Sequence, residues 1–91
     1  MITIEQAQTI VEQMGNYFDS HDFIYAYIIE YPEAYLEILR SFGSVERANG
    51  RIAAFLQEKQ GKYLSIQQLG KVRSMNVFGR ETLCEHWKQV R

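Results

Sequence analysis

Helix start and stop signals divide residues 1–61 of this 91-residue chain into four segments, and they limit its fold more than any other feature. The first segment begins at Thr3, and Gln6 three residues later completes a capping-box pattern. Gly15 and Asn16 mark its end, where we expect the last turn to fray. Its apolar residues recur at helical spacing and predict one buried stripe: Ile4, Ala7, Ile10, Val11, Met14 and Phe18.

A second helix is predicted after residues 19–22, whose short polar side chains favour helix N-termini. Pro32 ends this helix, because proline has no backbone N–H and disfavours helical angles in the residue before it. The same proline suits the first turn of a third helix over residues 32–42, and Gly43 suits its left-handed C-cap. The apolar positions of these two helices are Phe23, Ile24, Tyr27, Ile28, Tyr31, Tyr35, Leu36, Ile38, Leu39 and Phe42.

Ser44 is the expected N-cap of a fourth helix, which covers residues 45–60 and is closed by Gly61. Asn49 and Gly50 lie inside this segment, and both are poor residues for a helix interior. A turn at this pair is the alternative, but the apolar stripe stays in phase across it, and we expect the helix to continue. The stripe consists of Val45, Ala48, Ile52, Phe55 and Leu56.

The character of the sequence changes after Gly61. Residues 63–70 are interpreted as a short helical turn or a connector, residues 71–78 as a strand, and residues 83–90 as a returning strand after a turn at Gly79 and Arg80. The alternative is a final helix over residues 81–90, and we favour the hairpin. The predicted fold is one α+β domain over residues 1–91, mainly helical, with about four helices followed by a C-terminal β-hairpin.

Cysteine usage and hydropathy limit the cellular setting. Cys84 is the only cysteine, so the chain cannot form the internal disulfides on which small secreted domains usually depend. The N-terminus lacks the basic flank and apolar run of a signal peptide. The longest apolar stretch, residues 23–29, is far shorter than the roughly 20 residues of a membrane span. We therefore expect a soluble, cytoplasmic chain that does not contact a membrane.

Charge is distributed unevenly along the chain. Residues 1–44 contain one basic and seven acidic residues, whereas residues 45–91 contain nine basic and four acidic residues. The halves therefore carry about −6 and +5, although the net charge is only −1. This asymmetry predicts an oriented surface for a polyanion or another protein. The alternative is that the two halves fold against each other and partly neutralise.

The third and fourth helices, joined by a short turn around Gly43, have the layout of a helix-turn-helix motif. In that motif residues near the start of the second helix meet base edges in the major groove. Here Arg47 and Arg51 are four residues apart on one helix face, with Asn49 between them. Arginine and asparagine can make bidentate contacts to guanine and adenine, so we expect these three residues to contact DNA.

The predicted hairpin carries Lys71, Arg73 and Arg80, which are spaced to meet backbone phosphates. Over residues 23–90 the layout resembles the winged helix-turn-helix class of DNA-binding domains. The resemblance implies that residues 45–60 are the recognition helix and residues 71–90 the wing, with the acidic first helix away from the DNA. Many DNA-binding domains are more basic than this chain, whose isoelectric point is about 6.1, which argues against tight non-specific binding.

Two functions are therefore expected from the sequence. The first is binding to double-stranded DNA in a regulatory role through Arg47, Asn49, Arg51, Lys71, Arg73 and Arg80. The alternative is a non-catalytic protein-interaction or dimerisation module. Its acidic, tyrosine-rich second and third helices would bind a protein partner or a second copy through an acidic strip and exposed tyrosines such as Tyr25. The strip comprises Asp22, Glu30, Glu33 and Glu37.

The segment from Cys84 to Trp87 also contains His86, and cysteine and histidine are both metal ligands. A structural zinc site normally takes four such ligands, and the chain has one cysteine and two histidines. We therefore expect Cys84 to be a small buried residue and Trp87 to anchor the C-terminus. No phosphate loop, dinucleotide fingerprint or nucleophile elbow occurs, so we expect no enzyme activity, cofactor or metal.

Overall fold

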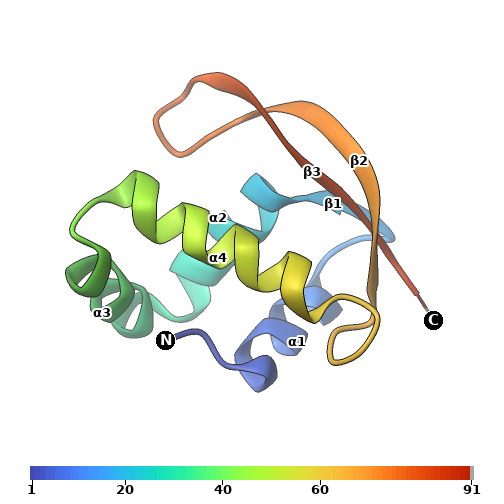
Figure 1. The fold of residues 1–91 in the computed structure, drawn as a ribbon, viewed down its shortest axis with the longest axis horizontal. Helices are drawn as coiled ribbons and strands as arrows, with labels where there is room; N and C mark the ends of the chain where they lie inside the picture. Colours follow the sequence, from blue (N-terminus) through green and yellow to red (C-terminus); the bar gives the residue numbers. More distant parts are fainter. Residues whose placement is uncertain (91) are drawn as a thin grey trace.

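The computed structural model describes residues 1–90, which form four α-helices and a three-stranded antiparallel sheet (Figure 1). The predicted α+β class and the C-terminal hairpin are both confirmed. None of the helices within residues 1–90 is long and apolar enough to cross a membrane. In chain order the elements are α1 (Ile4–Gln13), β1 (Tyr17–Asp19), α2 (Ser20–Glu30), α3 (Pro32–Phe42), α4 (Val45–Lys59), β2 (Ile66–Met75) and β3 (Glu81–Gln89).

The predicted starts of α1, α3 and α4 are confirmed, whereas α2 begins at Ser20, within the segment expected to precede it. The Thr3 hydroxyl accepts from the Gln6 N–H at 3.1 Å, and the Gln6 side chain accepts from the Thr3 N–H at 3.2 Å. Asp19 and Asp22 form a second capping box at the start of α2. The Ser44 hydroxyl caps α4 by accepting from the N–H of its third residue. Such caps typically contribute about 1 kcal/mol each.

Strand β1 corrects the prediction for the first helix. Phe18 was expected on the apolar stripe of that helix, but the helix ends at Gln13 and Phe18 is buried in β1. The strand is three residues long and pairs antiparallel with β3, with Phe18 opposite Trp87. A three-residue segment is too short to show a strand period, and its partner lies almost 70 residues further along the chain. Its pairing is therefore a purely tertiary feature.

The hairpin is longer than predicted. Residues 63–70 were interpreted as a turn or connector, but β2 already begins at Ile66 and ends at Met75. The register shifts between Gln68 and Gly70, which is a β-bulge and hides the alternation expected of a strand. The turn is also wider than Gly79 and Arg80, because the Asn76 side chain accepts from two backbone N–H groups within it. Residues 81–89 form β3, so the helical alternative is wrong.

Strand β3 is the element that connects the sheet to the helices. The strand order β1-β3-β2 puts β3 in the centre of the sheet. Trp87 is fully buried, as predicted, and its indole N–H donates to the Ser20 hydroxyl at 3.0 Å. Gln89 is also buried, and its amide nitrogen donates to the carbonyl oxygens of Val11, Met14 and Gly15 at 2.8–3.1 Å. The base of the hairpin is thereby bonded to the end of α1 and the start of α2.

Tyr27 gives one test of the packing of α1 on α2. Its ring is fully buried, and its hydroxyl donates to Gln6 on α1 at 3.0 Å. Burial, reinforced by the nearby Tyr31 and Glu37, raises the pKa of Tyr27 to about 12 from its ordinary value of 10.0. Because the folded-state pKa is raised, the associated stability is present below pH 10 and is lost as the pH rises towards 12.

We therefore expect the difference in unfolding free energy between the wild-type chain and a Tyr27→Phe variant to depend on pH. It should shrink by about 2 kcal/mol between pH 10 and pH 12, at 1.36 kcal/mol per pKa unit. Urea titrations at several alkaline pH values would measure it, and groups other than Tyr27 cancel in the comparison. A difference that stays constant over this range would contradict the buried, hydrogen-bonded position of the ring.

Candidate functional site

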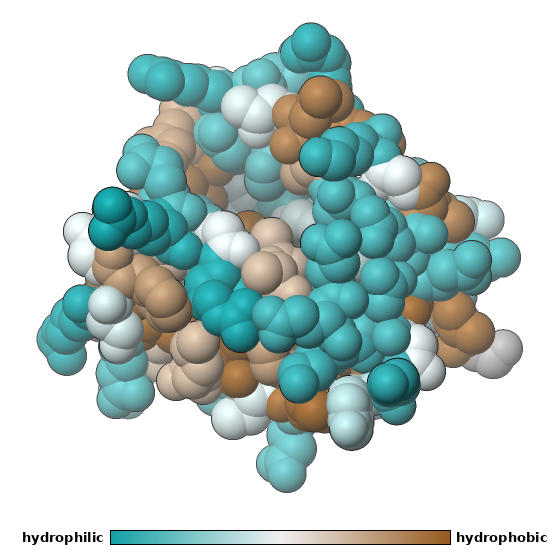
Figure 2. Space-filling view, viewed as in Figure 1, coloured by the Kyte–Doolittle hydropathy of each residue, from teal (hydrophilic) through white to brown (hydrophobic). Residues whose placement is uncertain are grey.

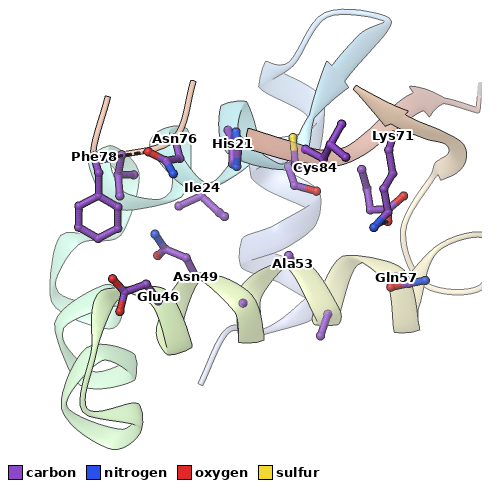
Figure 3. Close-up of a pocket in the computed structure, with 16 residues that line it drawn as sticks. His21, Ile24, Glu46, Asn49, Ala53, Gln57, Lys71, Asn76, Phe78 and Cys84 are labelled. Atoms are coloured by element: carbon purple, nitrogen blue, oxygen red, sulfur yellow. Dashed lines mark hydrogen bonds and ion pairs between the residues drawn. The ribbon is translucent and has the colours of Figure 1, made fainter. Parts of the chain in front are cut away.

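The hairpin extends over α4 and leaves a cavity of about 440 Å³ between the two (Figures 1 and 3). The first residues of α2 form its third wall. The space-filling view shows the hollow between the hairpin and α4, with hydrophilic and hydrophobic residues around it (Figure 2). Its size falls in the range of small-molecule and cofactor pockets, roughly 300–1,000 Å³.

Small residues on α4 explain why this space is open. Gly50, Ala53 and Ala54 line the cavity from the helix, so no long side chain fills the gap to the hairpin. The pair Asn49 and Gly50 does continue the helix, as expected. The hairpin contributes apolar groups at the opposite side, and two of them, Phe78 and Leu83, are 52% and 60% exposed.

The predicted DNA-contacting residues of α4 lie in different environments. Arg47 is exposed and makes no ion pair with any residue in the range 1–90. Arg51 forms a bidentate pair with Glu58 two turns later, with nitrogen–oxygen distances of 2.7 and 3.4 Å. This pair raises the pKa of Arg51 and lowers that of Glu58.

Asn49 lies at the cavity rather than beside the two arginines. Its side-chain oxygen accepts a hydrogen bond of 2.8 Å from the Tyr35 hydroxyl, which connects α4 to α3. In Figure 3 the side chains of Asn49 and Glu46 rise from α4 towards the hairpin turn. Reading adenine needs both the oxygen and the nitrogen of an asparagine amide. Only the nitrogen of Asn49 is without a hydrogen bond among the described residues.

The predicted basic residues of the hairpin are also divided. Lys71 lines the cavity, and its ammonium group is 3.9 Å from the Glu85 carboxylate across the hairpin. The pair is largely exposed on the lysine side, and such a surface pair contributes little to stability. Arg73 and Arg80 are exposed, and neither is in an ion pair within the described part of the chain.

Cys84 is close to a histidine, but not the one next to it in sequence. The sequence suggested a pair with His86, whereas the structure brings Cys84 together with His21 and Asp19. One ligand atom from each of the three lies within 4.8 Å of the others. Burial raises the pKa of the Cys84 thiol, and the backbone N–H groups of His21 and Ser20 partly offset this effect. More than 60 residues separate Cys84 from the other two residues, so no local spacing could reveal this cluster.

The surfaces of α2 and α3 carry the features of the alternative function. All four residues of the acidic strip, Asp22, Glu30, Glu33 and Glu37, are exposed. Tyr25 is 43% exposed, and its hydroxyl donates to the Asn76 carbonyl oxygen at 3.2 Å, which connects α2 to the hairpin turn.

Comparisons of the chain with protein-family models, with curated proteins and with solved structures found no match.

Proposed function

We propose that this chain binds double-stranded DNA through α4 and the β2–β3 hairpin. The observation that carries the proposal is the position of the hairpin over α4, with exposed arginines on both elements (Figure 1). Arg47 on α4 and Arg73 and Arg80 on the hairpin have no ion pairs among residues 1–90, so their charge is available to a polyanion. Exposed arginines of this kind contact phosphate oxygens and orient a protein on a duplex.

The rigid base of the hairpin supports the same proposal. Trp87 and Gln89 bond the base of the hairpin to α1 and α2, and at the turn the Tyr25 hydroxyl of α2 donates to the Asn76 carbonyl oxygen. The proposed contacts with bases are weaker than those with phosphates, because Arg51 and Asn49 already bond to Glu58 and Tyr35. We therefore propose a binding mode dominated by phosphate contacts, with modest sequence preference and no catalytic step, in the cytoplasm.

Salt titration tests this proposal quantitatively. Each phosphate contact contributes about −0.9 to the slope of log affinity against log salt, so three arginines predict a slope of about −2.7. Fluorescence anisotropy with a labelled duplex of mixed sequence would measure it. The triple variant Arg47→Ala, Arg73→Ala, Arg80→Ala is expected to lose nearly all binding at low salt, while its stability changes by less than about 0.5 kcal/mol.

Arg40 offers a matched control, since it is an exposed arginine on α3. The Arg40→Ala variant should bind DNA like the wild-type chain. Binding that is absent at low salt, or that is equal in the triple variant and the wild type, would contradict the proposal.

Exposed apolar side chains among the acidic residues favour protein binding as a second candidate function. On α2 and α3, Ile29 is 78% and Leu36 is 48% exposed, beside the exposed carboxylates of the acidic strip. An apolar centre with a charged rim is typical of protein interfaces. If a second copy is the partner, light scattering should show a mass that rises with concentration, and Ile29→Glu should abolish the rise. A constant monomer mass would contradict self-association.

A further inference from the structure

Three potential metal ligands from distant parts of the chain meet where β1 leads into α2. Asp19 is the last residue of β1 and lies opposite His86 in the antiparallel pairing with β3. Side chains two residues apart on a strand point to the same face, so Cys84 shares the face of His86 and Asp19. The first turn of α2 then brings His21 to the same place (Figure 3). One ligand atom of each residue lies within 4.8 Å of the others.

His21 supplies an independent observation at this position. Its Nδ1 atom is buried and has no hydrogen-bond partner within residues 1–90. A buried polar nitrogen without a partner loses its hydrogen bond to water and gains none in return, so such groups are rare in stable folds. A metal ion bound to this nitrogen would supply the missing interaction.

We propose that Asp19, His21 and Cys84 bind a Zn²⁺ ion, with His21 coordinating through Nδ1 and a water molecule in the fourth position. In a tetrahedral zinc site, neighbouring ligand atoms are about 3.3–3.5 Å apart, given Zn–S of about 2.3 Å and Zn–N or Zn–O of about 2.0 Å. Shifts of about 1 Å, within the reach of side-chain rotation, would therefore close the observed cluster. Asp19 can both cap α2 and bind metal, because Oδ1 accepts the Asp22 N–H and leaves Oδ2 available.

The chemistry of the three groups selects zinc over the harder cations. Calcium and magnesium take oxygen ligands, whereas a thiolate and an imidazole favour zinc and other late transition metals. The thiol of Cys84 would lose its proton to solvent on binding, so one proton is released per ion. One thiolate and one carboxylate then balance the charge of Zn²⁺, which leaves a neutral site in a half-buried position. The bound ion would join β3 to the start of α2 next to the proposed DNA-binding hairpin.

Cobalt titration of the full, metal-free chain tests the assignment. We expect one Co²⁺ per chain, with visible d–d bands of a tetrahedral ion and a thiolate-to-cobalt charge-transfer band, and full displacement by Zn²⁺. Cys84→Ser and His21→Gln should each weaken Co²⁺ affinity more than about tenfold. Their metal-free melting temperatures, measured in parallel, establish that the variants are folded. His86→Gln is the matched control, a histidine two residues from Cys84, and should keep an affinity within about threefold of wild type.

A second readout uses the unaltered protein. Zn²⁺ should protect the Cys84 thiol from alkylation and raise the melting temperature, because a ligand of the folded state stabilises it. Magnesium at the same concentration should do neither. The assignment is overturned if Co²⁺ produces no charge-transfer band, if His21→Gln binds like the wild type, or if His86→Gln abolishes binding.

Discussion

Replacing Trp87 with alanine is expected to lower the free energy of unfolding by about 3–5 kcal/mol. The side chain is fully buried in the central strand, and alanine would leave a large cavity in the core. The change would also leave the Ser20 hydroxyl, buried at the start of α2, without its indole donor. Urea denaturation followed by circular dichroism measures the loss, since this is the only tryptophan and its fluorescence disappears with it.

The Trp87→Phe variant separates packing from the hydrogen bond. Phenylalanine fills most of the space but cannot donate to Ser20, so we expect a loss of about 1–3 kcal/mol. A Trp87→Ala loss below about 1 kcal/mol would mean that the sheet and the helices do not share one core.

Replacing Gln89 with leucine is expected to cost about 2–3 kcal/mol, although the residue gains hydrophobicity. The amide nitrogen of Gln89 donates to the carbonyl oxygens of Val11, Met14 and Gly15 around the end of α1. Leucine has a similar size but no donor, so the carbonyl oxygens of Met14 and Gly15 would lose this partner, whereas that of Val11 keeps the Met14 N–H. Urea denaturation measures the cost.

Gln67 provides the comparison for this variant, because it is an exposed glutamine on the same hairpin. Gln67→Leu should change the stability by less than about 0.5 kcal/mol. Equal effects of the two substitutions would show that the bonds from Gln89 to α1 are not important for stability.

Part of the candidate site could be predicted from the sequence alone. The basic residues of the fourth helix and the hairpin were recognisable from charge alone, and Arg47, Arg73 and Arg80 do lie on exposed parts of those elements. The engagement of Asn49 by Tyr35 was not predictable, because it depends on how α3 packs against α4. The cavity was equally hidden, since it arises from small residues on α4 and from the path of the hairpin above them.

The ligands of the proposed metal site were also not predictable from the sequence. Counting only cysteines and histidines argued against zinc, because the chain has three of them. In the structure the carboxylate of Asp19 also belongs to the cluster of potential ligands. The histidine close to Cys84 is the distant His21 and not the neighbouring His86. Neither change follows from sequence spacing, because β1 was not recognisable as a strand and its pairing with β3 creates the cluster.

The sequence by itself determined the number and order of the helices of this protein. The helix ends are fixed by interactions between residues at most four positions apart, so they do not depend on the rest of the chain. The residues that make these interactions are Thr3, Asp19, Pro32, Gly43 and Ser44. Only the tertiary structure decided where β1 lies, where β2 begins, and which side chains meet at the cavity and at Cys84. Those features join residues far apart in sequence, and they form only when the whole core brings the segments together.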